Sequence, residues 1–502
     1  MDLREAFVES AHRWGDRETI LEGDRGFKLS ELAAGVAAMS DLLRSADRSQ
    51  TGHVGLLLPN THASVPAFFG AIFAGKVPVP MNPQAPPAEL GSMISATGIQ
   101  TVLTLSPLRR SVEALAREGL AGLTAFYLDE MGAGLDDRAK SAPAGLGPLR
   151  RLEAMLGQKI PDVACMLFSS GTTGQPKAVM LTHRNLMSNF LSVRQVFDYG
   201  PQDTVYGLLP LFHSFGLFVF NLALFGGPRF VMASRFVPLE ALRAIEKYRI
   251  TIFLLVPQIY QALTRTDTAR SLDWSSVRIC LAGGAATPKA LREAWKELTG
   301  RTLYQGYGLT ENSPVVSLCV PESQREGSVG KPMPGVEVKI VDEDEQSLEP
   351  GRQGEVWVRG PSVMKGYYNN PQATRETVDP AGWLHTGDYG LLDEDNFLFI
   401  SGRKKDIIIV AGENVHPSEI EEALLSHPDV GEACVVGVPD EAHGEVPKGF
   451  VVLKPERRLD SQALRVYLRD RLAPYKIPRE IVALEQLPKN TMGKVLKRQL
   501  PA

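Results

Sequence analysis

Short apolar strand patterns alternate with helical stretches from the N-terminus to about residue 330, and this alternation constrains the fold more than any other feature of the sequence. The extended patterns HVGLLLP and VPVPM flank the helical pattern ASVPAFFGAIFAG, and the same order returns in TVYGLLP, TIFLLVP and VRICLAGGA. Strands that are separated by helices pair in parallel, with helices on both faces of the sheet. We therefore predict an α/β protein with a large N-terminal domain of doubly wound sheets.

The pattern changes twice in the remaining sequence. From about Gly330 the stretches VEVKIVDEDEQ, GRQGEVWVRG and DNFLFISGR show the alternation and the turns of antiparallel strands. After Arg403 the helical patterns SEIEEALLSH and DSQALRVYLRDRL enclose the strand patterns ACVVGVP and KGFVVL. We predict an N-terminal domain at residues 1–401, with a small β subdomain from about 325 to 401, and a small α+β C-terminal domain at residues 407–502.

Charge and cysteine usage exclude several classes of protein. The chain has 54 Lys and Arg against 58 Asp and Glu in 502 residues, a net charge of -4, so we expect no nucleic-acid partner. The four cysteines stand far apart, without the spacing of a zinc site or a disulfide framework, which is typical of a reducing compartment.

Two hydrophobic features bear on the location of the protein. The start MDLREAFVES lacks the basic start and apolar core of a signal peptide. The longest apolar run, from Phe215 to Gly227, is shorter than the roughly 20 residues that a spanning helix needs, so we interpret it as core or as the wall of a pocket. We expect a cytoplasmic protein without a transmembrane segment; peripheral contact with a membrane stays open.

A loop rich in hydroxyl groups and glycine follows the apolar pattern VACMLF. It reads SSGTTGQPK from Ser169 to Lys177, so its backbone amides and hydroxyl groups can surround an anion, with the lysine as a mobile point charge. This composition suits a polyphosphate ligand. The Walker pattern requires Ser or Thr after the lysine, and Ala178 stands there, so the pattern excludes a P-loop NTPase.

Further motifs follow this loop in the order PLFHSFG, LAGGAA, QGYGLTE, GWLHTGD, GRKKDIII and PKNTMGK. On these motifs the chain resembles the AMP-forming adenylating enzymes, a family that includes acyl-CoA synthetases, nonribosomal-peptide adenylation domains and luciferases, and it is most similar to the fatty acyl-CoA ligases. The resemblance covers nearly the whole chain. It implies that a carboxylate attacks the α-phosphate of ATP to give acyl-AMP and pyrophosphate, and that a thiol then accepts the acyl group. Mg²⁺, ATP and coenzyme A are the implied cofactor and substrates.

The resemblance also implies which residues bind the nucleotide. The Tyr307 ring would lie against adenine, and Asp388 would accept hydrogen bonds from the ribose, with Arg403 beside it. The Thr310 hydroxyl would contact a phosphate, and the Glu311 carboxylate would bind Mg²⁺. The full set implied for ATP and AMP is Ser169, Ser170, Gly171, Thr172, Thr173, Gly174, Lys177, Gly283, Gly284, Ala285, Gly306, Tyr307, Gly308, Asp388 and Arg403.

The C-terminal motifs imply a change of domain arrangement between the two steps. Lys494 is the implied catalyst of adenylation, because its ammonium group can stabilise charge between the carboxylate and the α-phosphate. The hinge is implied at residues 402–406, around Lys405. The implied thiol tunnel is formed by Ala411, Gly412 and Glu413. A nucleotide sensor without catalytic activity would be expected to lack Lys494, Glu311 or Asp388, and all three are present.

Substrate choice is predicted from the motif PLFHSFG and the apolar run that follows it. Relatives that activate amino acids commonly use an acidic residue in this region, and PLFHSFGLFVFNLALFGG has none, so an uncharged acyl chain fits better. His213 resembles the residue that contacts the carboxylate of the acid; a buried histidine satisfied by the backbone is the alternative. The small residues of LAGGAA favour a deep pocket, as in enzymes that activate fatty acids.

Alternatives stay open for the identity of the acid and of the thiol acceptor. We expect a fatty acid, and the alternative is an aryl or other carboxylic acid. An acyl carrier protein presents the same phosphopantetheine thiol as coenzyme A, so an enzyme that loads a carrier protein is the second alternative. The sequence shows no fused carrier or reductase domain, and we expect free coenzyme A as the acceptor.

Overall fold

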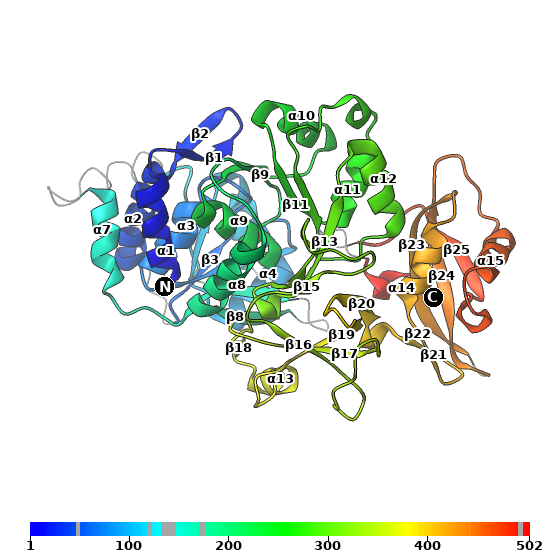
Figure 1. Cartoon of the computed structure of the whole chain (residues 1–502). Coiled ribbons are helices and arrows are strands. Elements are labelled where there is room, and N and C mark those ends of the chain that lie inside the picture. Colours follow the sequence, from blue (N-terminus) through cyan, green and yellow to red (C-terminus); the bar gives the residue numbers. More distant parts are fainter. Residues whose placement is uncertain are drawn as a thin grey trace.

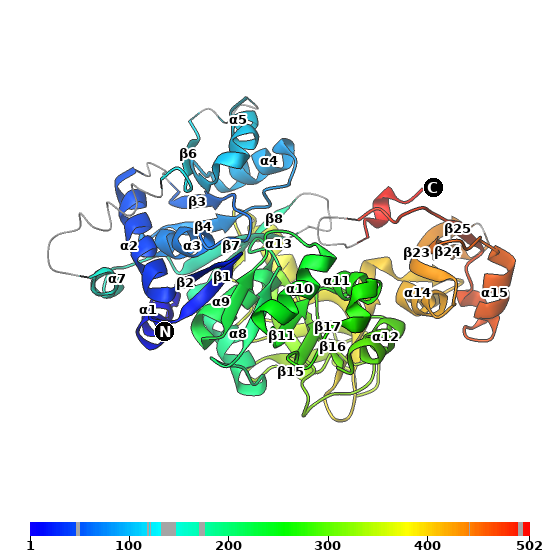
Figure 2. The ribbon, with the colours of Figure 1, turned by 90° about the horizontal axis from the view of Figure 1, so that it is seen from above.

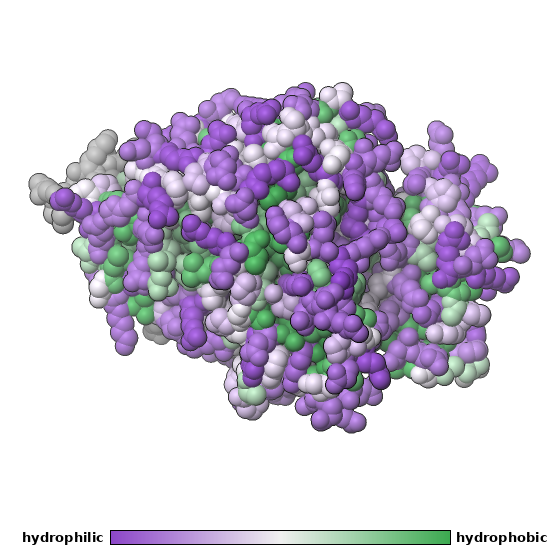
Figure 3. Space-filling model, viewed as in Figure 1, coloured by the Kyte–Doolittle hydropathy of each residue, from purple (hydrophilic) through white to green (hydrophobic). Residues whose placement is uncertain are grey.

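The computed structural model describes residues 1–46, 51–117, 120, 122–131, 147–169, 176–440, 442–489 and 495–501. It consists of a large body and a small C-terminal domain that lies at one end of the molecule (Figure 1, right; Figure 2). On the face drawn in Figure 3, a furrow runs between the two, and the surface of both is mainly hydrophilic. The predicted fold class is confirmed, because the body contains α/β sheets and a β subdomain, and an α+β domain follows them.

A four-stranded parallel sheet, in the order β4-β3-β5-β6, lies in the N-terminal part of the body. All residues of β3, β4 and β5 are buried, which explains why the sequence has continuous apolar runs here. The elements of this part are α1 (Leu3–Trp14), α2 (Leu29–Ala46), β3 (His53–Leu56), α3 (Ser64–Phe73), β4 (Val77–Pro80), α4 (Pro87–Thr97), β5 (Thr101–Thr104), η1 (Ser106–Leu108), α5 (Arg109–Arg117), β6 (Thr124–Tyr127) and α7 (Pro148–Leu156).

A nine-stranded mixed sheet, in the order β15-β14-β13-β12-β11-β9-β10-β1-β2, is the largest sheet of the described residues. The run from β13 to β1 is parallel, and β14, β15 and β2 pair antiparallel at its two edges. Its elements are β1 (Glu18–Glu22), β2 (Arg25–Lys28), α8 (His183–Val196), β9 (Thr204–Gly207), α9 (Ser214–Gly226), β10 (Arg229–Met232), α10 (Pro238–Tyr248), β11 (Ile252–Leu255), α11 (Pro257–Thr264), η2 (Asp267–Ser271), β12 (Ile279–Ala282), α12 (Lys289–Thr299), β13 (Leu303–Gly308), η3 (Thr310–Asn312), β14 (Val315–Leu318) and β15 (Lys331–Pro332).

Two antiparallel sheets complete the body. The first, β18-β8-β7, contains the strands on either side of the hydroxyl-rich loop, and the second, β16-β17-β19-β20, is the β subdomain. The elements are β7 (Val163–Ser169), β8 (Lys177–Thr182), β16 (Glu337–Val341), β17 (Gly354–Arg359), β18 (Gly366–Tyr367), α13 (Pro371–Thr377), β19 (Leu384–Leu392) and β20 (Leu398–Arg403).

Helix α9 contains the long apolar run and is buried on every side. Each residue from Gly216 to Gly226 is buried, and Phe220 and Phe225 pack against Phe69 of α3. A Cβ atom at Gly216 would collide with the carbonyl group of Pro210, so glycine lets the helix start close to the preceding turn. Within the described residues, no helix is both long enough and apolar enough to cross a membrane.

The C-terminal domain has a hydrophobic core of its own. Ile408, Leu424, Val451 and Leu468 belong to one buried cluster that contains no residue of the body. The elements that surround this cluster are η4 (Lys404–Asp406), β21 (Ile408–Val410), β22 (Glu413–Val415), α14 (Pro417–Leu425), β23 (Val430–Asp440), β24 (Gly444–Leu453), α15 (Ser461–Arg469), η5 (Pro474–Lys476), β25 (Glu480–Ala483) and η6 (Lys497–Gln499).

Candidate active site

The hydroxyl-rich loop connects two paired strands. Ser169 is the last residue of β7 and lies opposite Lys177, the first residue of β8. The pairing therefore fixes both ends of the predicted phosphate loop. The loop residues between them that we predicted as ligands lie outside the described residues: Ser170, Gly171, Thr172, Thr173 and Gly174.

The segment after β13 turns back on itself at the edge of the large sheet. A Cβ atom at Gly308 would collide with the carbonyl group of Pro314, so glycine is required for this close approach. The Thr310 hydroxyl lies 3.2 Å from the Ser214 hydroxyl at the start of α9. Glu311 accepts a hydrogen bond of 2.9 Å at its Oε1 atom from the Tyr367 hydroxyl.

The glycine turn after β12 lies beside the same edge. Gly283 follows β12 directly, and the position of its Cβ would be 3.8 Å from the carbonyl oxygen of Gly306 in β13. Because β12 and β13 are parallel neighbours, their carboxyl ends meet at one edge of the sheet, where ligands of α/β proteins commonly bind. Gly284 has φ +82°, and Ala285 follows it. The predicted residues Gly283, Gly284, Ala285, Gly306, Tyr307 and Gly308 thus come from two adjacent strand ends.

Three predicted nucleotide ligands contact one another. The Tyr307 hydroxyl donates a hydrogen bond of 2.6 Å to Oδ2 of Asp388. Arg403 lies opposite Asp388 on the neighbouring strand, and its Nε atom is 3.4 Å from Oδ1 of that carboxylate. Burial, together with the adjacent Asp388, raises the pKa of Tyr307 well above its usual value. These contacts join the end of β13 to the β subdomain.

His213 is a partly buried histidine whose Nε2 atom is shielded from solvent. It precedes α9, its ring lies 4.7 Å from the Phe212 ring, and its Nε2 atom has no hydrogen-bond partner among the described residues. Burial lowers its pKa to about 4, so the ring is neutral near pH 7. His213 precedes Ser214, whose hydroxyl lies 3.2 Å from that of the predicted phosphate ligand Thr310.

The donor atoms near Glu311 suit Mg²⁺. Glu311 and Thr310 offer oxygen atoms only, and no group of three or more His, Cys, Asp and Glu side chains is found in the described part of the chain. A zinc or iron centre would need such a group. Mg²⁺ keeps several waters and takes further oxygen ligands from the phosphates of a nucleotide, so one carboxylate is sufficient.

The residues predicted in the C-terminal domain lie on its surface. Lys405 is the middle residue of η4, and burial, followed by the charge of Arg403, lowers its pKa. The thiol-tunnel residues Ala411, Gly412 and Glu413 form the exposed turn of the β21–β22 hairpin, and no atom lies within 4 Å of the position of a Cβ at Gly412. Lys494 lies outside the described residues.

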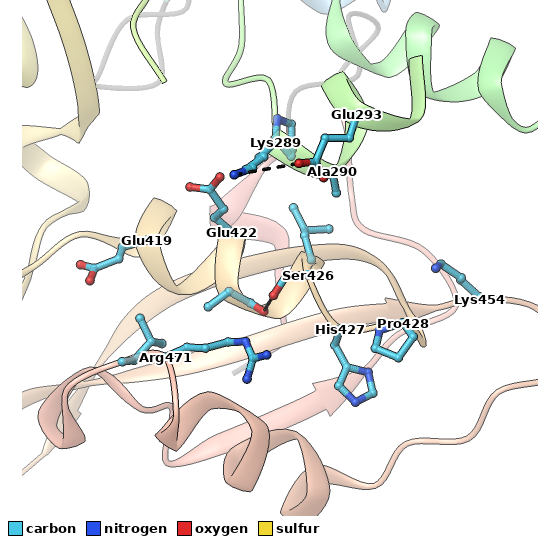
Figure 4. Close-up of a pocket in the computed structure, with 14 residues that line it drawn as sticks. Lys289, Ala290, Glu293, Glu419, Glu422, Ser426, His427, Pro428, Lys454 and Arg471 are labelled. Carbon is cyan, nitrogen blue, oxygen red and sulfur yellow. Dashed lines mark hydrogen bonds and ion pairs between the residues drawn. The ribbon is translucent and has the colours of Figure 1, made fainter. Parts of the chain in front are cut away.

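A cavity of about 580 Å³ lies elsewhere, between the body and the C-terminal domain (Figure 4). Its walls come from the start of α12, including Lys289 and Glu293, and from the C-terminal domain, including Glu422 and Arg471. None of the predicted nucleotide ligands lines it. Because both sides of the furrow contribute walls, the shape of this cavity depends on the arrangement of the two domains.

The sequence analysis did not identify Tyr367 and Ser214 as residues of the candidate site. Tyr367 lies 56 residues from Glu311 in the sequence, so no local spacing connects them. A tyrosine in a β-rich segment is typical of packing, and the sequence contained no signal for a polar role. Ser214 was within a quoted motif but had no assigned contact, because a hydroxyl at the start of an apolar helix is typical of a helix terminus.

Three comparisons with known proteins show the family to which the chain belongs. Residues 7–368 match the family described as AMP-binding enzyme, and residues 419–494 match the AMP-binding enzyme C-terminal domain. The chain is 33% identical to a long-chain-fatty-acid–CoA ligase of Bacillus subtilis, with 99% of this chain and 94% of the relative covered. It is 32% identical to 4-coumarate–CoA ligase 1 of Narcissus pseudonarcissus, with 100% and 93% covered.

A solved structure is similar over the whole chain. It is the o-succinylbenzoate CoA synthetase of Bacillus subtilis in complex with its acyl-adenylate intermediate. The TM-score is 0.85 at 30% identity, and the similarity covers 100% of this chain and 99% of the other.

Proposed function

The chain belongs to the AMP-binding enzyme family and is an AMP-forming acyl- or aryl-CoA ligase with ATP and coenzyme A as substrates, and from this premise we propose that its acid is a fatty acid. The observation that carries the proposal is the largely apolar helix α9, which is buried from Gly216 to Gly226 and begins beside the predicted phosphate ligand Thr310. An alkyl chain gains roughly 0.8 kcal/mol for each CH₂ group removed from water, and such a wall provides that burial.

The proposed first step depends on charge neutralisation and positioning. A carboxylate and the α-phosphate of ATP are both anionic, so in-line attack requires cations and hydrogen-bond donors around the phosphates. We assign Lys177, Lys494 and an Mg²⁺ ion on Glu311 to this task, and Asp388, held by Tyr307 and Arg403, to the ribose. Mg²⁺ would supply charge neutralisation of the phosphate oxygens.

The proposed carboxylate site lies at the start of α9. The Nε2 atom of His213 is buried and has no hydrogen-bond partner among the described residues, and the ring is neutral near pH 7, so it can exchange a hydrogen bond with the acid. From Phe215 to Phe225 the run contains one polar side chain, Asn221, and no charge, so the ammonium group of an amino acid would lack a counter-ion there.

An aryl acid is the second candidate, and one contact favours it. The Phe215 ring has its Cε1 atom 3.2 Å from the position of a Cβ at Gly283. This ring occupies space next to the glycine turn, whose small residues favoured a deep pocket in the sequence analysis. A flat space beside an aromatic ring suits a planar acid, and two of the similar proteins are named for 4-coumarate and o-succinylbenzoate.

The test is a matrix of acids and thiols. Pyrophosphate release and thioester formation would be measured with even-numbered saturated acids, aryl acids and amino acids, each with coenzyme A or with a phosphopantetheinylated carrier protein. We expect kcat/KM to rise a few-fold per added CH₂ until the pocket is full, with coenzyme A as the acceptor. A preference for aryl acids would contradict the fatty-acid proposal, and acylation of the carrier protein alone would contradict the proposed acceptor.

Phe215→Ala tests whether the ring sets the length limit. Removing the ring should move the preferred chain to longer acids, because the added space lies against Gly283. A substitution at Gly284 is a poor probe of pocket depth, since its φ of +82° favours glycine and a larger residue would strain the backbone. Leu217→Ala, in the fully buried part of α9, is the matched control for general loosening of the helix.

A further inference from the structure

Tyr367 contacts two of the residues that we assign to the phosphates. Its hydroxyl group donates a 2.9 Å hydrogen bond to Oε1 of Glu311, and the Nζ atom of Lys177 lies 5.0 Å from the centroid of its ring. Glu311 and Lys177 belong to different motifs: Lys177 begins β8, and Glu311 lies in η3, between β13 and β14 of the nine-stranded sheet. One side chain therefore lies between the carboxylate proposed for Mg²⁺ and the lysine that ends the phosphate loop.

The backbone around Tyr367 holds this side chain firmly in place. Strand β18 pairs with β8, with Tyr367 opposite Val179, two residues from Lys177. The Tyr367 amide donates a hydrogen bond of 2.9 Å to the Thr374 hydroxyl, and only 7% of the residue is exposed. A side chain buried and paired in this way has few alternative positions, so its hydroxyl can fix the direction of the Glu311 carboxylate.

The segment before Tyr367 also forms hydrogen bonds with Glu311 and with the next residue, Asn312. The Met364 amide donates a hydrogen bond of 2.8 Å to the carbonyl oxygen of Glu311, and the Ser362 hydroxyl donates one of 2.9 Å to the Asn312 side chain. Glu311 is thus held at its backbone and at its carboxylate by the same segment, residues 362–367.

We propose that Tyr367 is a positioning residue for the metal-dependent binding of ATP: its hydroxyl orients the Glu311 carboxylate toward Mg²⁺, and its ring supports Lys177. The proposal rests on the ATP-dependent activity of the family and on the assignment of Mg²⁺ to Glu311. Hydrogen bonds to a metal-ligating carboxylate typically change metal affinity by about 10- to 100-fold. Tyr367 binds Oε1 of Glu311, and we assign the other oxygen atom, Oε2, to the metal.

The test is a calorimetric titration of ATP at several Mg²⁺ concentrations, without acid or thiol. For Tyr367→Phe, which keeps the ring over Lys177, we expect the Mg²⁺ concentration that half-saturates ATP binding to rise about tenfold. The affinity for AMP without metal should not change. A Mg²⁺ dependence equal to that of the wild type would overturn the proposal, and so would an equal loss of AMP and ATP affinity, which indicates a packing role.

Two further variants test the two contacts separately. In a Glu311→Gln background, Tyr367→Phe should have no added effect on the Mg²⁺ dependence; a further tenfold change there would overturn the link to Glu311. Tyr367→Leu removes the ring as well and should weaken ATP binding even at saturating Mg²⁺. If the Leu and Phe variants bind ATP equally under that condition, the part assigned to Lys177 is overturned.

Tyr368→Phe is the matched control. Tyr368 is the next residue, and its ring packs edge-on against His53, 5.0 Å away between centroids, rather than against Glu311. This variant should keep the Mg²⁺ dependence of the wild type, and a change as large as that of Tyr367→Phe would overturn the specific role. Since neither acid nor thiol is present, the result is independent of which acid the enzyme activates.

Discussion

Burial determines the chemistry of His213. The folded protein buries much of the ring, including its Nε2 atom, and this desolvation lowers the pKa of His213 to about 4. The ring is uncharged at neutral pH, and its Nε2 atom has no partner among the described residues. A neutral imidazole can exchange a hydrogen bond with a carboxylate without forming an ion pair that would have to be broken when the acid attacks ATP.

The burial of His213 predicts a pH-dependent stability. Between pH 6.5, the usual pKa, and about 4, the unfolded chain binds a proton that the folded ring does not, so this residue lowers the free energy of unfolding as the pH falls. The slope from one such group is at most about 1.4 kcal/mol per pH unit. His213→Phe keeps a ring of similar size and removes the effect.

Denaturant unfolding of both proteins between pH 7 and 4 measures this contribution. The stability of His213→Phe relative to the wild type should increase as the pH falls through that window. Other buried histidines with lowered pKa values, such as His53 and His183, are present in both proteins and cancel in the difference. A difference that stays constant with pH would contradict the assignment.

At the scale of single elements, one carboxylate connects the proposed hinge to the turn that we propose for the ribose. Glu355 of β17 accepts a hydrogen bond of 3.3 Å from the Gly387 amide, next to Asp388, and one of 2.8 Å from the Nζ atom of Lys404. Glu355 is nearly buried while Lys404 is half exposed. The strand end before Lys405 is therefore fixed to the body, which confines rotation to the residues that follow.

Lys405→Pro should separate the two half-reactions. Proline fixes φ near -65° and restricts rotation, but it is compatible with the present turn, because η1 of this chain has Pro107 at the same middle position. In this arrangement the turn at Gly412 faces solvent, so we assign the arrangement to adenylation. The variant should form acyl-AMP and transfer it to the thiol roughly tenfold more slowly, equivalent to ~1.4 kcal/mol.

Rapid-quench measurements of each half-reaction check this prediction. Lys405→Ala is the control, because it removes the charge and leaves rotation free. If both half-reactions of the proline variant keep wild-type rates, the hinge lies elsewhere. If the proline variant loses both half-reactions while Lys405→Ala is normal, the present turn does not tolerate proline. Our assignment of the present domain arrangement to adenylation is then wrong.

Local patterns predicted some elements of the fold, and long-range pairing explains the rest. The apolar runs at β3, β4, β9, β11 and β12 are buried parallel strands, as predicted, and the alternation after Gly330 is antiparallel. Strand β1 was not predicted: Ile20 pairs with Phe230, and a contact across such a distance has no local signal. The contact between Tyr367 and Glu311 was missed for the same reason.

At the scale of the whole molecule, the candidate site residues gather at one edge of the nine-stranded sheet. The strand ends of β12 and β13, the start of α9 and the β subdomain meet there, and the C-terminal domain lies across a furrow from the body (Figures 1 and 3). In the proposed reaction, a carboxylate oxygen first attacks the α-phosphorus of ATP and releases pyrophosphate. The thiol sulfur then attacks the carbonyl carbon atom of the acyl-AMP and releases AMP. A small domain that rotates about a short hinge can exchange the groups around the reacting atoms without dismantling the nucleotide site.

Lys494→Ala tests the proposal that each domain arrangement catalyses one of the two half-reactions. The lysine would act in adenylation only, so the variant should lose pyrophosphate release with acid and ATP. It should still convert supplied acyl-AMP and coenzyme A to thioester at a near-normal rate. Equal loss of both reactions would contradict a role restricted to one arrangement.

The central claim is that a fatty acid is first joined to AMP and then passed to coenzyme A at one site. Its most direct test is a single-turnover experiment with excess enzyme, a long-chain acid and ATP labelled at the α-phosphate, first without thiol. We predict that fatty acyl-AMP accumulates with an equal amount of pyrophosphate, and that added coenzyme A then converts all of it to acyl-CoA and labelled AMP. Formation of ADP and orthophosphate, or an acyl-AMP that coenzyme A does not discharge, would contradict the account.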